Sequence, residues 1–269
     1  RDDATILESL HITSAYYISS IEVAPAVDTI AVYLDIPILR DADDYPMIYG
    51  AGMGDGTPFP GSVFLRATDD VNFDVLETLT ESTVIGDCTS TLPDWTGGAI
   101  FDETSWVDVD VGEKTLTATT SAAILNSAEV NAYAIGAHGR WEIGQFRNPE
   151  LRSSSPNVYR LTGLLRGRRG TEWACLNHRS DDKFVLLQMS GLRVLELSNS
   201  QLGLDLYYRA VTIGRRLSTA ASQTINAQGV YSMPFAPVAL HAERSETTGD
   251  ISFTWQRRTR RSVRMTGTL

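Results

Sequence analysis

Residues 157–172 read NVYRLTGLLRGRRGTE, and this stretch indicates what kind of fold the chain forms. Its first nine residues are rich in the branched and aromatic side chains that favour β-strands. The strand then runs into a turn, where Gly167 and Gly170 allow tight backbone conformations and three arginines project. Residues 182–187, DKFVLL, follow after a short gap and predict a second strand that returns along the first.

Similar runs recur along the chain and are separated by clusters of Gly, Pro, Asp and Ser. They predict strands at 15–23, 28–34, 62–67, 71–76, 105–111, 131–145, 157–165, 183–188, 204–213 and 251–255. The predicted loops are 50–58, which has four glycines in its first seven residues, 92–98 and 153–156. Helical periodicity is short, at 121–127 and at a turn near 171–177. We therefore predict a mainly β fold of antiparallel sandwich or barrel-like domains with few short helices.

The size and composition fit a globular protein. The chain has 269 residues, of which 42% are hydrophobic, enough to build a core. No run approaches the roughly 18 consecutive apolar residues that a membrane-spanning helix needs. Because the first residue is Arg1, we expect the chain to begin either inside a longer polypeptide or after a processing event. Cys88 and Cys175 lie far apart and form no metal-ligand spacing, so we expect two free, buried thiols.

The charge is divided unevenly along the chain. Residues 1–113 contain 22 Asp and Glu but three Lys and Arg, whereas residues 114–269 contain 11 acidic and 20 basic residues. Arginine accounts for 21 of the 23 basic residues, and its planar fork is favoured at protein interfaces. A basic half could bind nucleic acid, but the acidic total and the lack of interleaved aromatic residues favour docking of acidic against basic protein surfaces.

Sequence motifs for catalysis are absent. The chain lacks a GxSxG elbow, an HExxH motif, a phosphate-binding P-loop and an EF-hand loop. The four histidines, His11, His138, His178 and His241, occur in no motif that would predict a partner. The acidic cluster at 41–44 indicates a solvated turn, with weak calcium binding as the alternative. We predict no catalytic residue, cofactor or metal site.

Several segments together carry a family resemblance. They are 34–41 with 49–52, 128–136 with 141–146, 157–172 with 182–187, and 249–260, in this order along the chain. The core LLRGRRGTE is the most specific of them. The sequence resembles the C-terminal region of tail-tip or baseplate hub proteins, also called host-specificity proteins, of long-tailed bacteriophages and phage-like gene transfer agents.

The resemblance implies a structural protein, not an enzyme, located in the virion at the tail tip. Such a hub connects the tail tube to fibres or receptor-binding proteins and takes part in host attachment and genome delivery. The implied partners are further copies of the chain in a homotrimer, other tail proteins and tail fibres, with a host receptor or polysaccharide as an additional candidate. Nucleic acid would be met as DNA passing through the tail channel.

The same resemblance suggests three parts. We expect an acidic β-rich hub segment at 1–100, a β domain carrying the arginine motif at 101–233, and the start of an incomplete fibronectin-like domain or C-terminal strands at 234–269. The predicted interface or structural motif consists of Gly163, Arg166, Gly167, Arg168, Arg169, Gly170 and Glu172. Internal salt bridges within one domain are the alternative role for these arginines.

Two other classes of function stay open at this point. One is a hydrolase of cell-envelope polysaccharide or peptidoglycan, which would need paired carboxylates in a cleft. Asp94, Asp102 and Glu103, which lie near aromatic residues, are the first candidates for such a pair. The other is a carbohydrate-binding or receptor-binding module, which would display an exposed aromatic patch.

Overall fold

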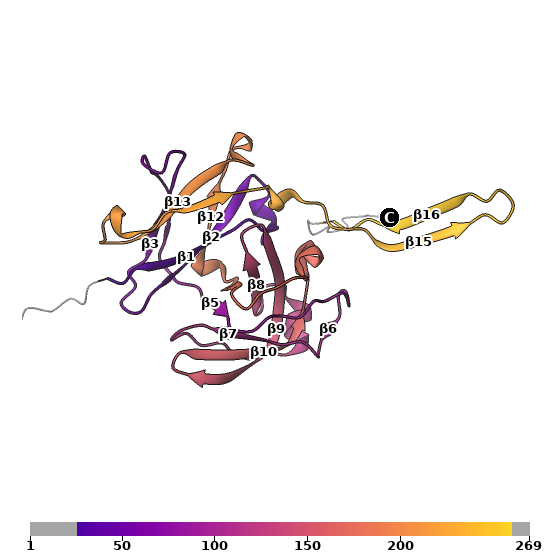
Figure 1. Cartoon of the computed structure of the whole chain (residues 1–269), viewed down its shortest axis with the longest axis horizontal. Coiled ribbons are helices and arrows are strands. Elements are labelled where there is room, and N and C mark those ends of the chain that lie inside the picture. Colours follow the sequence, from indigo (N-terminus) through magenta and orange to yellow (C-terminus); the bar gives the residue numbers. More distant parts are fainter. Residues whose placement is uncertain (1–25, 260–269) are drawn as a thin grey trace, which may run out of the picture.

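The computed structural model describes residues 26–259, which form two sheets, a barrel and a hairpin (Figure 1). The predicted strand at 15–23 lies outside the described residues. The middle sheet has the order β1-β2-β12 and consists of β1 (Thr29–Leu34), β2 (Met47–Gly54) and β12 (Leu192–Glu196). The outer sheet has the order β14-β13-β3-β4 and consists of β14 (Gln223–Asn226), β13 (Asp205–Thr212), β3 (Ser62–Ala67) and β4 (Asp74–Leu79).

Six antiparallel strands close into a barrel because β10 pairs with both β7 and β9. They are β5 (Ile85–Cys88), β7 (Val107–Asp110), β8 (Ala132–Ala137), β9 (Arg140–Ser154), β10 (Asn157–Leu165) and β11 (Lys183–Leu186). The two-residue strand β6 (Phe101–Asp102) pairs with the end of β10. Closure leaves these strands without a free edge, where unpaired backbone N–H and C=O groups could pair with another chain.

The helical elements are short, as the weak helical periodicity predicts. The α-helix α1 (Ser121–Asn126) begins at Thr120, whose side-chain oxygen accepts a hydrogen bond from the backbone N–H of Ala123. The remaining helical elements are single 3₁₀ turns at Asp41–Asp43, Arg168–Gly170, Glu172–Ala174, Met189–Gly191, Asn199–Gln201, Leu217–Thr219 and Val230–Ser232. The prediction of a mainly β fold with few short helices is confirmed.

Strand alternation explains how the barrel packs on the middle sheet. In β8, Tyr133 and Ile135 point into the barrel core, while Ala132 and Ala134 point outward to a second core shared with the middle sheet. The middle sheet is itself buried on both faces, because its alternate residues join a third core against the outer sheet. The order is therefore outer sheet, middle sheet, barrel.

The glycine-rich stretch at 50–58 is where the sequence prediction was wrong. Its first half is not a loop but the end of β2, every residue of which is buried. A Cβ on Gly50 would lie 3.0 Å from the Leu195 side chain and 3.1 Å from the ring of Phe64. The glycines are therefore needed for close packing of the two sheets rather than for a turn, a use that composition alone does not distinguish.

Other predictions agree closely with the structure. The predicted strands at 62–67 and 157–165 match β3 and β10 at both ends, and the predicted strand at 131–145 is the hairpin of β8 and β9. Cys88 and Cys175 are free and buried. Among residues 26–259, no helix has the length and apolar character needed to span a membrane.

Strand pairing joins segments that lie far apart in the chain. The barrel begins with β5, and after β11 the chain returns to the first two sheets with β12, β13 and β14. The division into three parts stays a prediction. Residues 238–256 form the hairpin of β15 (Val238–Arg244) and β16 (Ile251–Gln256). Figure 1 shows this hairpin projecting away from the other sheets, and all of its residues are exposed.

Candidate functional site

The arginine turn lies directly after β10, where its chain leaves the barrel. Gly167, Arg169 and Gly170 all have left-handed backbone conformations, with φ of 59°, 55° and 82°. Two of these positions are glycine, which adopts such angles without a steric penalty. Arg169 does so at a cost of about 1–2 kcal/mol, so the surrounding contacts must hold the turn in this shape.

Arg166 points back into the barrel and is completely buried. Its Nε and Nη2 donate to Glu142 Oε1 and Oε2 at 2.5 and 2.6 Å, a two-point ion pair. Its Nη1 donates to the carbonyl of Pro93 at 3.0 Å, and Gly167 N donates to Glu142 Oε1 at 3.2 Å. Glu142 lies opposite Ile135 in the β8–β9 ladder and so faces the barrel interior. The pair therefore fixes the turn to the inside of the barrel.

A histidine continues this buried network. His178 Nε2 contacts Glu142 Oε2 at 2.8 Å, and its Nδ1 contacts Asp182 Oδ2 at 2.8 Å. Arg140 Nη2 donates to both carboxylate oxygens of Asp182. Both ring nitrogens thus lie within hydrogen-bond distance of a carboxylate, which fixes the orientation of the imidazole ring.

Asp102 joins the same charge cluster from the end of strand β6. Its Oδ2 lies 3.6 Å from Arg166 Nη1, and its Oδ1 accepts from the backbone N–H groups of Thr104 and Ser105. With Asp102 counted, three carboxylates face two arginines and one histidine. Each carboxylate thus lies against an arginine, which is the condition under which buried charges can be tolerated inside a protein.

The surroundings shift the pKa values of the carboxyls in this network. Burial raises the pKa of Glu142, but hydrogen bonds from His178 and Arg166 outweigh burial and lower the pKa below its ordinary value of 4.5. Burial also raises the pKa of Asp182, but hydrogen bonds from His178 and Arg140 outweigh burial and lower the pKa. Both groups are therefore held ionised, which suits ion pairing rather than proton transfer.

The next arginines of the turn face outward. Arg168 and Arg169 line a cavity of about 420 Å³ between the turn and the base of the β15–β16 hairpin. Arg169 Nη1 donates to the carbonyl of Ile38 at 2.9 Å, while Arg258 Nη1 donates to Glu172 Oε1 at 2.6 Å. The turn thus contacts the barrel, the loop after β1 and the C-terminal hairpin.

The glycines of the predicted motif are each required by a close neighbour or a backbone angle. Gly163 has φ of 62° and lies against the guanidinium of Arg147. A Cβ on Gly170 would collide with the ring of Phe235, which packs at the base of the hairpin. The structure therefore brings Gly167, Gly170, Arg166, Arg168, Arg169 and Glu172 together at one end of the barrel, with Gly163 two residues before the end of β10.

Sequence reasoning missed the partners of Arg166. Glu142 is the single charged residue in the buried run Trp141 to Phe146, and such isolation in a strand is a usable signal of a buried ion pair. Glu142 lies on β9 and Arg166 follows β10, 24 residues later in the sequence, so no local sequence pattern linked the two. His178 and Asp182 come from the loop before β11 and were identified only through the fold.

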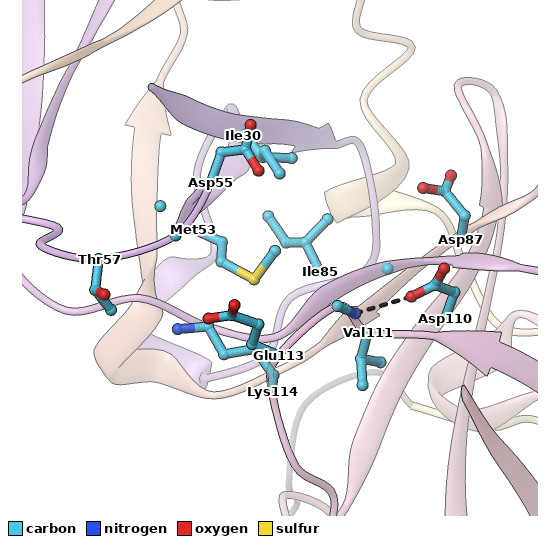
Figure 2. Close-up of a pocket in the computed structure, with 14 residues that line it drawn as sticks. Ile30, Met53, Asp55, Thr57, Ile85, Asp87, Asp110, Val111, Glu113 and Lys114 are labelled. Atoms are coloured by element: carbon cyan, nitrogen blue, oxygen red, sulfur yellow. Dashed lines mark hydrogen bonds between the residues drawn. The ribbon is translucent and has the colours of Figure 1, made fainter. Parts of the chain in front are cut away.

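A larger cavity, of about 500 Å³, lies between the middle sheet and the barrel. Figure 2 shows the apolar side chains of Met53 and Ile85 between the carboxylates of Asp55 and Asp110. Asp110 Oδ1 accepts from Gly112 N at 2.9 Å. Across the part of the chain that the structure describes, no group of three His, Cys, Asp or Glu side chains is arranged to hold a metal ion.

The three carboxylates proposed for a hydrolase each have a local role. Asp102 holds the turn at 104–105, and although burial raises its pKa, hydrogen bonds from Ser105 and Thr104 lower it. Glu103 forms an ion pair with Arg147, and Asp94 Oδ1 accepts from Asn177 N at 2.7 Å. None of the three lines the cavities described above. The acidic turn is similar in character, since Asp43 accepts from Arg40 and from Tyr49 Oη.

A family model matches the middle of the chain. The family model described as "Rcc01698-like, C-terminal" matches residues 83–185. No curated protein matches the sequence. The matched span starts just before β5 and ends within β11, so it coincides with the six barrel strands and includes the arginine turn. The barrel with its turn is thus the part of the chain that is similar to that family.

Proposed function

We propose that this chain is a structural segment of the tail-tip or baseplate hub of a phage or phage-like particle. In this role it would connect the tail tube to fibres or receptor-binding proteins during host attachment and genome delivery. The observation that carries the proposal is the barrel at 83–185, whose arginine turn contains the LLRGRRGTE motif that resembles hub proteins. The family match and the motif resemblance fall on the same structural unit.

The side-chain chemistry of the turn supports a connecting role. Arg166 and Glu142 form a two-point hydrogen-bonded ion pair, and the pKa of Glu142 is lowered, so the pair ties the turn to the barrel. Its outward side contacts the loop after β1 through Arg169 and the hairpin through Glu172. A segment that joins neighbouring elements of an assembly needs a fixed frame of this kind.

The location is tested by immunogold electron microscopy of purified particles, with an antibody raised against the 269-residue chain. Gold at the tip of the tail is the expected result. An antibody against the major capsid protein, which should label heads, is the control for access. Particles labelled at heads by the control and unlabelled at the tip would overturn the proposal.

The assembly state is tested by light scattering of the purified chain at about 50 mM and 500 mM salt. We expect a trimer at low salt whose mass falls at high salt, because the screening length of exposed charge pairs falls from about 14 Å to about 4 Å between these concentrations. A salt-independent trimer would instead place the apolar surface, not the divided charge, at the interface. A monomer at both salt concentrations would contradict self-assembly of this segment.

One observation favours a second candidate, a receptor-binding or carbohydrate-binding module. Phe253 and Trp255 are two residues apart on β16 and are 58% and 59% exposed, next to exposed Leu240. Aromatic rings on an exposed sheet face can stack on sugars or on a protein receptor. If the unmodified chain binds cell-envelope polysaccharide and Trp255→Ala does not, this candidate is supported. If the polysaccharide retains the unmodified chain and Trp255→Ala equally, the candidate is removed.

A further inference from the structure

The cavity beside the arginine turn has an uncompensated positive charge. It measures about 420 Å³, within the usual range of ligand sites. Arg168, Arg169 and Arg258 line it together with Glu172. Glu172 pairs with Arg258, so these two charges cancel. Among the residues that the structure describes, Arg168 and Arg169 form no ion pair with a carboxylate, and the charges of Glu172, Glu129 and Asp41, which act on them without contact, offset theirs only in part.

Half-buried, unpaired cations are costly to keep. Burial lowers the pKa of Arg168, and the nearby charge of Arg258 lowers it further. Burial likewise lowers the pKa of Arg169. Arginine nevertheless stays charged in proteins, so the cost falls on folding stability. Arg169 also has a left-handed backbone, which adds strain at the same place.

Such costs mark a site prepared for a counter-ion. The opposite side of the cavity is built from small and apolar residues, including Ala99, Pro237 and Val238. A low-polarity wall strengthens charge-assisted hydrogen bonds to the guanidinium groups, because water competes less there. The backbone carbonyl of Arg168 accepts hydrogen bonds from Thr171, but its guanidinium forms none within residues 26–259, so its planar fork is available for two-point binding of a carboxylate.

We propose that this cavity binds the carboxylate side chains of an acidic protein segment. The charge division of the chain favours this occupant, since residues 1–113 show that strongly acidic and strongly basic surfaces occur in one protein. The apolar wall also suits the methylene groups of Asp or Glu side chains. The site is a property of the folded chain and does not depend on a location in a tail tip.

The test is an NMR titration of the ¹⁵N-labelled 269-residue chain with the peptide triglutamate at about 50 mM salt. We expect saturable shifts of the Gly167 and Gly170 amide signals. Triglutamine, which has the same length but no charge, should leave these signals in place. Pyrophosphate is titrated in parallel, and binding tighter than triglutamate by tenfold or more would overturn the choice of a carboxylate ligand.

Arg168→Ala should weaken triglutamate binding by about tenfold, the effect of losing one charge-assisted contact. Arg216→Ala, which removes the same charge from an exposed position away from the cavity, should leave the affinity unchanged. Equal weakening in both variants would show a general charge effect and overturn the site. Arg168→Lys keeps the charge but loses the planar fork, and it should bind with intermediate affinity.

A stability measurement separates a binding role for Arg168 from a structural one. Without ligand, Arg168→Ala removes an unpaired, half-buried cation that lies near Arg258, so the thermal midpoint should stay equal or rise. Addition of triglutamate should raise the midpoint of the unmodified chain and not that of the variant. A lowered midpoint in the variant, with no response of either protein to triglutamate, would assign Arg168 to internal structure and overturn the proposal.

Discussion

Arg166 and Arg168 are two residues apart on one turn, yet they occupy opposite electrostatic environments. Arg166 is buried and has a two-point ion pair with Glu142, a backbone carbonyl and a second carboxylate nearby. Arg168 is half-buried and lines a cavity. The neighbouring charge with the largest effect on its pKa is that of Arg258, another arginine. The same side chain therefore contributes to folding in one position and costs stability in the other.

Adjacent arginines of one turn can therefore have different roles, which depend on the direction in which each side chain points. Between them, Gly167 has a left-handed backbone that reverses the direction of the chain, so one arginine points into the barrel and the other away from it. The inward position is completed by residues of this chain. The outward position is left for a partner. Four experiments test whether the two arginine environments contribute differently to stability.

The largest expected effect is that of Arg166→Ala. The substitution leaves Glu142 as an uncompensated buried charge and should lower the free energy of unfolding by about 3–5 kcal/mol. Urea denaturation followed by circular dichroism measures this change. Arg216→Ala, at an exposed position, should stay within about 0.5 kcal/mol of the unmodified chain. Similar small losses in both variants would mean that the barrel pair is not needed.

Acidification should produce the next largest effect. The pKa values of Glu142 and Asp182 are lower in the folded chain than their ordinary values of 4.5 and 3.8. The stability that these groups contribute is therefore complete above about pH 5 and is lost as the pH falls through the folded pKa values, because the unfolded chain binds protons first.

The acid effect is measured as the urea midpoint between pH 7 and pH 3. Glu142→Gln should flatten this pH dependence, since it removes one of the two groups that titrate. Asp74→Asn, at an exposed carboxyl of β4, should keep the full dependence. An unchanged slope in Glu142→Gln would show that acid sensitivity comes from elsewhere in the chain.

Double-mutant cycles compare the two environments directly. Arg166→Ala combined with Glu142→Ala should give a coupling free energy of about 1–3 kcal/mol, as expected for groups in one hydrogen-bonded network. Arg168→Ala combined with Glu172→Ala should give a coupling within about 0.5 kcal/mol of zero, because no hydrogen bond joins the two side chains and Glu172 pairs with Arg258. Equal couplings would abolish the distinction between the inward and outward arginines.

The smallest expected effect extends the comparison to the hairpin. Phe253→Ala should change the free energy of unfolding by less than about 0.5 kcal/mol, since the ring is exposed. Phe146→Ala, in the barrel core, should cost about 3–5 kcal/mol and is the matched control. Thermal or urea unfolding measures both. A large loss from Phe253→Ala would show that the hairpin face is covered in the folded chain.

Local composition predicted the elements whose own residues determine them. The strands β3 and β10 match their predicted limits because Val, Leu, Phe and Tyr alternate within them and turn residues bound them. The strand β2 was missed because its glycines are determined by Phe64 and Leu195, which lie elsewhere in the sequence. Local propensity carries no information about such contacts.

The site followed the same rule. The sequence identified Arg166, Arg168, Arg169 and Glu172 as a cluster, since they are adjacent in one unusual stretch. It did not distinguish their roles, because Glu142, His178 and Asp182 approach Arg166 only after the barrel closes. The direction in which each arginine points depends on the left-handed backbone at Gly167, which the presence of glycine permits but does not require.

The closed ring of strands has a mechanical consequence for the projecting hairpin. Pro234 and Pro237 stiffen the chain that leads into β15, and Phe235 and Arg258 fix its base to Gly170 and Glu172. Gly167 in turn is tied to the barrel interior through Glu142. A torque on the tip of the hairpin is therefore delivered to a ring in which no strand can slip without breaking hydrogen bonds on both of its sides. A force on the hairpin would thus be transmitted to the barrel as a whole.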